Sequence, residues 1–108
     1  MMPTRNVTLA LVPIAWLAIA PACAQDIASG KRIAERWCSS CHVVGREQRH
    51  APNDAVPTFQ AIAQMDSTTQ MSLAAFLTTP HAPMPNIVLS RAEIADISAY
   101  ILSLRKPR

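Results

Sequence analysis

Apolar and small residues recur at helical spacing in several segments of the chain. The first of these segments follows Asp26, a favourable residue at a helix N-terminus. Its apolar or small positions, three and four residues apart, are Ile27, Gly30, Ile33, Ala34 and Trp37. A second, shorter apolar helix is predicted from Phe59 to Met65. Each segment is expected to turn one face toward a core.

Two later helices are predicted to begin at capping boxes. Ser67-Thr68-Thr69-Gln70 has the Ser-x-x-Gln form, and the helix that it introduces ends at Pro80. The apolar residues of that helix are Leu73, Phe76 and Leu77. Ser90-Arg91-Ala92-Glu93 is the second box and opens a long C-terminal helix. Its apolar stripe consists of Ile94, Ile97, Ile101 and Leu104.

The remaining segments have loop character. Residues 44–56 are polar and contain Gly45 and Pro52, and His81 to Asn86 has prolines at alternate positions, which excludes a regular helix. No stretch alternates between apolar and polar residues for long enough to be a strand. The sequence therefore predicts an all-α domain of three main helices, one short helix and connecting loops.

The N-terminus has the layout of a secretory signal peptide. Arg5 precedes the apolar run Val7 to Ala20, which is shorter than the ~20 residues of a membrane span, and Ala22-Cys23-Ala24 provides a cleavage site before Gln25. An uncleaved membrane anchor, or a lipoprotein cut before Cys23, are the alternatives. We expect residues 1–24 to be removed, leaving residues 25–108 as one domain in the periplasm, without membrane insertion.

Size and charge narrow the function further. The formal net charge is +3, and Arg5 is the only charge in residues 1–24, so residues 25–108 carry +2 without a basic cluster, and no nucleic-acid partner is indicated. Their core is expected to be small, and their aromatic residues are Trp37, Phe59, Phe76 and Tyr100. A Cys38–Cys41 disulfide would close too short a ring to stabilise the fold much. Another group is therefore expected at the centre.

The segment Cys38-Ser39-Ser40-Cys41-His42 indicates what that group is, because Cys-x-x-Cys-His is the attachment pattern for c-type haem. Cysteines three apart at the end of a helix face the same way, so both thiols can add to the two vinyl groups along one haem edge. His42 can then bind the iron as its proximal ligand. The motif predicts one haem c, held covalently by two thioethers.

Three other interpretations of the cysteine pair remain open. A thioredoxin-like redox pair would need a βαβ context, which the pattern does not offer. A zinc site would need more ligands, and only His50 and His81 remain, at no familiar spacing. A structural disulfide is compatible with an exported protein but leaves the core unfilled.

The second axial position of the iron is predicted to belong to Met84. This residue lies between two prolines in a non-helical segment, where a stiff chain can present a thioether at low entropic cost. Met65 and Met71 lie in or beside helical patterns, so we expect both in the core. His81 is the rival ligand, since imidazole also binds haem iron well, and an open position is the third alternative.

Over residues 25–104, the chain resembles the small monohaem class I cytochromes c of bacteria. The resemblance rests on Gly30, on Cys38 to His42, on Pro57-Thr58-Phe59, on Pro83-Met84-Pro85 and on Tyr100. It implies that Met84 is the sixth ligand and that the first and last helices cross at Gly30 near Tyr100. It also implies that the Pro57 carbonyl accepts a hydrogen bond from the ring of His42.

The functional expectation follows from a haem iron with His42 and Met84 on its two faces. Such an iron has no free position for a substrate, which predicts a one-electron carrier between redox partner proteins and not an enzyme. A subunit of a periplasmic dehydrogenase complex and a haem sensor with a labile sixth position are the alternatives. The residues expected to form the apolar wall around the haem are Val43, Phe59, Leu73, Phe76, Leu77, Ile87 and Ile97.

Overall fold

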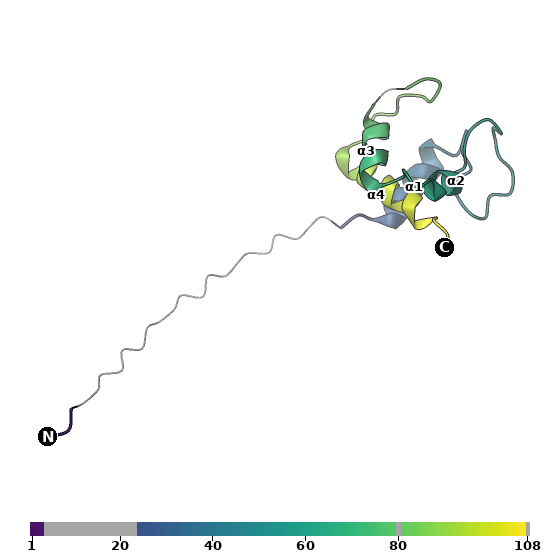
Figure 1. The fold of residues 1–108 in the computed structure, drawn as a ribbon. Coiled ribbons are helices and arrows are strands. Elements are labelled where there is room, and N and C mark those ends of the chain that lie inside the picture. The colour runs from purple at the N-terminus through teal and green to yellow at the C-terminus, as the bar shows by residue number, and fades with distance from the viewer. Residues whose placement is uncertain (4–23, 80, 108) are drawn as a thin grey trace.

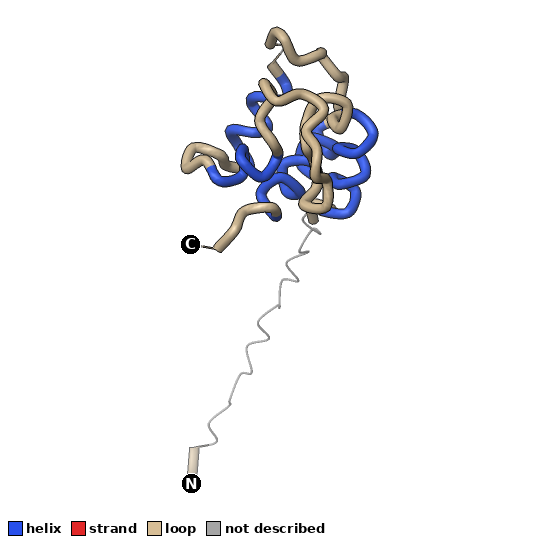
Figure 2. Tube along the Cα trace, turned by 90° about the vertical axis from the view of Figure 1, so that its right-hand side faces the viewer, coloured by secondary structure: helices blue, strands red, loops and turns tan. Residues whose placement is uncertain are grey.

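The computed structural model describes residues 1–3, 24–79 and 81–107, and these residues form helices and loops without a strand (Figures 1 and 2). The helices are α1 (Ile27–Trp37), α2 (Phe59–Gln64), α3 (Gln70–Thr78) and α4 (Arg91–Ser103). The prediction of three main helices and one short one is confirmed. Most of the predicted signal peptide, and Pro80, lie outside the described residues. None of the helices described is long and apolar enough to cross a membrane.

Helix α4 is the centre of the fold and packs against the other three helices, most extensively against α1 (Figure 1). Its predicted stripe is buried, with Ile97 only 1% exposed. At the α1–α4 crossing, a Cβ on Gly30 would overlap the carbonyl of Asp96 and lie 2.9 Å from Cβ of Tyr100. This close approach of two backbones confirms the predicted crossing at Gly30.

The helix starts follow local side-chain chemistry. Asp26 accepts a hydrogen bond from the Ser29 amide at the start of α1, and Ser90 forms a capping box with Glu93 at the start of α4. These two predicted N-termini are confirmed.

The predicted capping box of α3 is wrong by two residues. Thr69, not Ser67, is the N-cap, and its box partner is Ser72, whose hydroxyl accepts the Thr69 amide at 2.8 Å. The reason lies in Thr68, which is buried and donates its hydroxyl hydrogen bond to the Ile62 carbonyl at 2.7 Å. That tertiary contact holds residue 68 outside the helix, so α3 begins after Thr69.

The expectation that Met65 and Met71 belong to the core is also wrong. Their side chains are 48% and 82% exposed. Met65 is the C-cap residue of α2, where the chain has already left the helix. Met71 is two positions from the buried Leu73, and two positions correspond to about 200° around a helix, so the two side chains point to opposite sides.

Arg105 joins the C-terminal segment to the end of α2, a contact that the sequence pattern did not indicate. Its Nε donates to the Ala63 carbonyl at 2.6 Å, and its Nη2 donates to the Thr68 carbonyl at 2.8 Å. A cation beside the C-terminal carbonyls of a helix is also favourable for the helix dipole. The guanidinium therefore fixes α2, and with it the loop that precedes α2, against the last residues of the chain.

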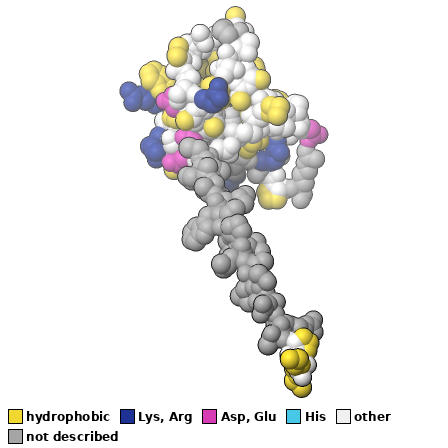
Figure 3. All heavy atoms as spheres, turned by 90° about the vertical axis from the view of Figure 1, so that its left-hand side faces the viewer, with side chains coloured by type: hydrophobic (Ala, Val, Ile, Leu, Met, Phe, Trp, Pro, Cys, Tyr) yellow, Lys and Arg dark blue, Asp and Glu magenta, His cyan; other side chains and the backbone are white. Residues whose placement is uncertain are grey.

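Two long loops leave this helical core, one joining α1 to α2 and the other joining α3 to α4 (Figure 1). On the face shown in Figure 3, Lys and Arg side chains lie at separate points, with Asp and Glu beside some of them. This face carries mixed charge and not one basic block.

Candidate functional site

The Cys-x-x-Cys-His motif lies in a compact turn directly after α1. Cys38 is the C-cap residue, and its carbonyl accepts hydrogen bonds from the amides of Cys41 at 3.2 Å and His42 at 2.9 Å. The expectation that the cysteines lie on the end of the helix needs this correction, because the helix itself stops at Trp37. The turn nevertheless brings Cys38, Cys41 and His42 together, as the motif requires.

The state of the two cysteines bears on the alternative interpretations. Both are free thiols and partly buried, so they do not form a structural disulfide. Burial raises the pKa of Cys38 to about 11, whereas reactive redox cysteines have lowered pKa values. Within the described part of the chain, no three His, Cys, Asp or Glu side chains are arranged to hold a metal ion.

His42 is oriented by the backbone of a distant residue. Its Nδ1 lies 2.7 Å from the carbonyl oxygen of Pro57, as the resemblance implied. The carbonyl can only accept, so the ring donates from Nδ1 and keeps the lone pair of Nε2 for a metal. Metal-binding histidines are commonly held by such a second hydrogen bond.

The segment around His42 is anchored to α2 and α4. The Phe59 amide donates to the Val43 carbonyl at 2.9 Å, and the Tyr100 hydroxyl donates to the Val44 carbonyl at 2.6 Å. The ring centroids of His42 and Phe59 are 5.4 Å apart. Burial, and then the carboxylates of Glu35 and Glu47, raise the pKa of Tyr100 above its ordinary value, so this anchor stays a neutral donor.

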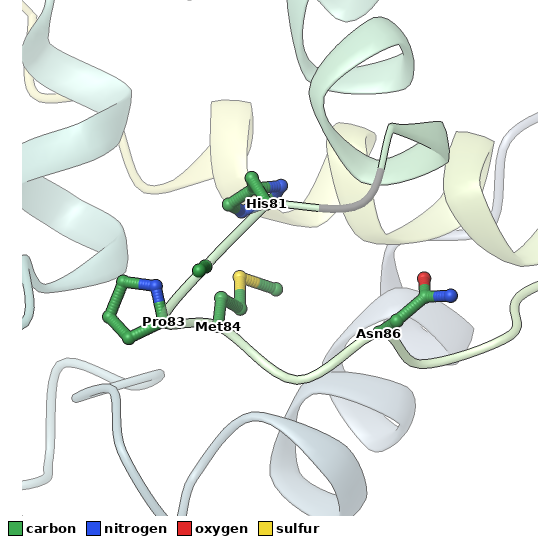
Figure 4. Close-up of a pocket in the computed structure, with 5 residues that line it drawn as sticks. His81, Pro83, Met84 and Asn86 are labelled. Atoms are coloured by element: carbon green, nitrogen blue, oxygen red, sulfur yellow. The ribbon is translucent and has the colours of Figure 1, made fainter.

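Met84 lies in the loop between α3 and α4, apart in sequence from the motif. It is partly buried and helps to line a hollow of about 360 Å³, whose other lining residues are His81, Ala82, Pro83 and Asn86 (Figure 4). Its side chain projects toward the arm of the loop that carries His81 (Figure 4).

His81 is held in a similar way to His42. Its Nδ1 lies 2.8 Å from the Thr79 carbonyl, its ring centroid lies 3.8 Å from that of Phe76, and its Nε2 is buried without a hydrogen-bond partner. The sequence marked this residue as a rival ligand, but its buried nitrogen became visible only in the structure.

Several of the residues expected to form an apolar wall around the haem are buried in the structure. Phe59, Leu73 and Ile97 belong to the buried core, and Leu77 packs partly against it. Phe76, by contrast, is 53% exposed and contacts His81.

The donor set fits haem c. Two free thiols three residues apart can form the two thioethers, and the imidazole of His42 keeps one nitrogen for a metal because the other is taken by Pro57. The thioether of Met84 is a soft neutral ligand of the kind that haem iron accepts.

Comparison with known proteins agrees with this chemistry. The family model described as cytochrome c matches residues 27–105. Cytochrome c-552 of Bradyrhizobium diazoefficiens is 48% identical over 84 residues, which cover 78% of this chain and 80% of the relative. No solved structure gives a significant match.

Proposed function

The chain belongs to the cytochrome c family and carries haem c, and from this premise we propose that it is a one-electron carrier whose haem is attached to Cys38 and Cys41, with His42 and Met84 as the axial ligands of the iron. Bound haem supplies an iron that alternates between the ferrous and ferric states. The protein supplies the attachment, the ligands and the surroundings.

The hydrogen bond between His42 and Pro57 is the observation that carries this proposal. At 2.7 Å it fixes both the tautomer and the plane of the imidazole before any ligand is bound. The carbonyls of Val43 and Val44 are in turn held by Phe59 and Tyr100. A ligand fixed in this way moves little when the charge on the metal changes, and small reorganisation favours rapid electron transfer.

Met84 supports the same function from the other loop. A thioether stabilises ferrous relative to ferric iron, and it raises the reduction potential above that of a haem with two imidazole ligands. When both axial positions are held by side chains, no position is left for a substrate. In the proposed function, the protein therefore passes electrons between partner proteins and is not itself an enzyme.

The location of the carrier is part of the proposal. The basic start, short apolar run and Ala22-Cys23-Ala24 site support export to the periplasm and cleavage before Gln25. The intact mass of the exported protein tests this: a lipid on Cys23 or retention of residues 1–24 would contradict it.

The optical spectrum of the exported holoprotein, oxidised and reduced, tests the ligation. We expect the ferric form to show the weak long-wavelength charge-transfer band of His/Met haem, and the ferrous form to resist carbon monoxide at neutral pH. The band should vanish in Met84→Ala and persist in Met65→Leu and Met71→Leu, whose exposed side chains serve as matched controls. An unchanged spectrum in Met84→Ala would reject Met84 as the ligand, and ready carbon monoxide binding would favour a haem sensor.

A further inference from the structure

The imidazole of His81 is prepared to bind a metal, although the proposed function does not use it. Because Nδ1 lies 2.8 Å from the Thr79 carbonyl, the ring donates from Nδ1 and Nε2 carries the lone pair. This Nε2 is shielded from solvent and accepts no hydrogen bond from the described residues. An unpartnered buried acceptor costs free energy, so this nitrogen is favourably placed to bind a partner that the described residues do not supply.

The two histidines share one arrangement. His42 and His81 each place Nδ1 within 2.8 Å of a backbone carbonyl, so each leaves Nε2 as the only nitrogen for a metal. Phe76 packs against the ring of His81, with centroids 3.8 Å apart and planes inclined by 45°. The ring is therefore fixed both at its edge and on its face.

His81 also shares the surroundings of Met84. Both side chains line the same hollow of about 360 Å³, and Figure 4 shows the Met84 side chain projecting toward the arm that carries His81. The segment between them, Ala82 and Pro83, has no regular secondary structure. A local adjustment of this loop can thus replace one side chain by the other without disturbing α3 or α4.

We propose that His81 is a reserve axial ligand, whose Nε2 takes the sixth position of the haem iron whenever the sulfur of Met84 does not occupy it. The proposal rests on the ligation given under the proposed function. In the exchange, the iron–sulfur bond breaks and an iron–nitrogen bond forms. Each ligand brings and keeps its own electron pair, so the oxidation state of the iron does not change.

The consequence is a second electron-carrying state in place of an open iron. Imidazole favours ferric iron more than a thioether does, so the reduction potential falls when His81 binds. His81 keeps the sixth position of the iron occupied, so a small ligand such as carbon monoxide must still displace a side chain in order to bind. Loss of Met84 would therefore convert the protein into a carrier of lower potential and not into a ligand-binding haem protein.

The test compares three holoproteins: Met84→Ala, Met84→Ala/His81→Ala and Met84→Ala/His50→Ala. His50 lies in the exposed loop before α2 and is the matched histidine control. Ferric Met84→Ala should be low-spin by electron paramagnetic resonance and have a lower potential than the wild type. The His81 double variant should be high-spin and bind carbon monoxide, when reduced, at least about tenfold more tightly than Met84→Ala, because the open state is no longer a minor population. The His50 double variant should match Met84→Ala.

Two results would overturn the reserve role while leaving the proposed function intact: a high-spin Met84→Ala protein, or a low-spin Met84→Ala/His81→Ala protein. If the ferric wild type is low-spin without the His/Met charge-transfer band and His81→Ala makes it high-spin, the assignment of Met84 in the proposed function fails instead. Should Met84→Ala accumulate poorly, Met84→Leu removes the sulfur, keeps most of the side-chain volume and gives the same comparison.

Discussion

Gly30 of α1 lies directly against the backbone carbonyl of Asp96 in α4, with no room for a side chain between them. Asp96 has a second role at this crossing, since its Oδ1 accepts a hydrogen bond from the Asp26 amide at 2.8 Å, next to the start of α1. The same face of α4 presents Tyr100, which holds the loop after the haem motif. The crossing therefore sets where the end of α1, and the cysteines that follow it, lie relative to α4.

The first prediction concerns that crossing. In Gly30→Ala, the added methyl group meets backbone atoms, so the two helices must separate. We expect the free energy of unfolding of the holoprotein to fall by about 3 kcal/mol, as measured by guanidinium unfolding. Gly45→Ala is the matched control, because a Cβ there meets no backbone atom: it lies 3.2 Å from the end of the Glu47 side chain and 3.9 Å, an ordinary contact distance, from the Tyr100 hydroxyl. Equal losses in the two variants would contradict the argument.

The second prediction concerns Tyr100. In Tyr100→Phe, the 2.6 Å hydrogen bond to the Val44 carbonyl is lost, and that carbonyl belongs to a residue only 4% exposed. We expect the free energy of unfolding to fall by roughly 1–2 kcal/mol at neutral pH.

The pH dependence of the same variant has a defined sign. The pKa of Tyr100 is raised in the folded protein, first by burial and then by Glu35 and Glu47. The fold therefore prefers the neutral phenol, and its contribution is complete below the ordinary pKa of 10.0 and lost as the pH rises through the raised value. Thermal unfolding between pH 9 and 11 should show a smaller decline for Tyr100→Phe than for the wild type. The same slope in both proteins would count against this role.

The third prediction concerns the capping box of α4. The carboxylate of Glu93 accepts the Ser90 amide at 2.7 Å, and this hydrogen bond lowers the pKa of Glu93 below its ordinary value of 4.5. The ionised form therefore stabilises the fold above that value, and the contribution disappears as the pH falls through the lowered pKa. At pH 7, Glu93→Gln should have a lower melting temperature than the wild type. At pH 3, where Glu93 is more protonated, the difference in melting temperature between the two proteins should be smaller. A gap that stays constant with pH would reject the charge as the cause.

The fourth prediction concerns the attachment. Cys38→Ala and Cys41→Ala should each leave little mature holoprotein, because the polypeptide alone has a small core. Ser40→Ala, which lies between the cysteines and is exposed, should retain it. Haem staining of denaturing gels measures the covalently bound fraction. Extraction of haem from the wild type into acidified organic solvent would contradict covalent attachment.

Several features could be predicted from the sequence because their causes are local. The starts of α1 and α4 were predicted at Asp26 and Ser90, since an N-cap side chain bonds to an amide only three residues away. The start of α3 was predicted two residues too early, because Thr68 is engaged by the carbonyl of Ile62, in the preceding helix. The exposure of Met71 likewise depends on which side of α3 meets α4, and a weakly amphipathic helix does not specify that side.

The sequence by itself determined the proposed attachment chemistry, since two thiols and an imidazole at this spacing form the attachment pattern for c-type haem wherever the chain places them. The tertiary structure decided how the ligands are held. The carbonyl that orients His42 is 15 positions away, and the one that Tyr100 fixes is 56 positions away. The buried nitrogen of His81, and the clamp of Arg105 on α2, also exist only after the helices have packed. Such contacts depend on the relative placement of elements that share no local signal, and only the packing of the whole chain around α4 fixes that placement.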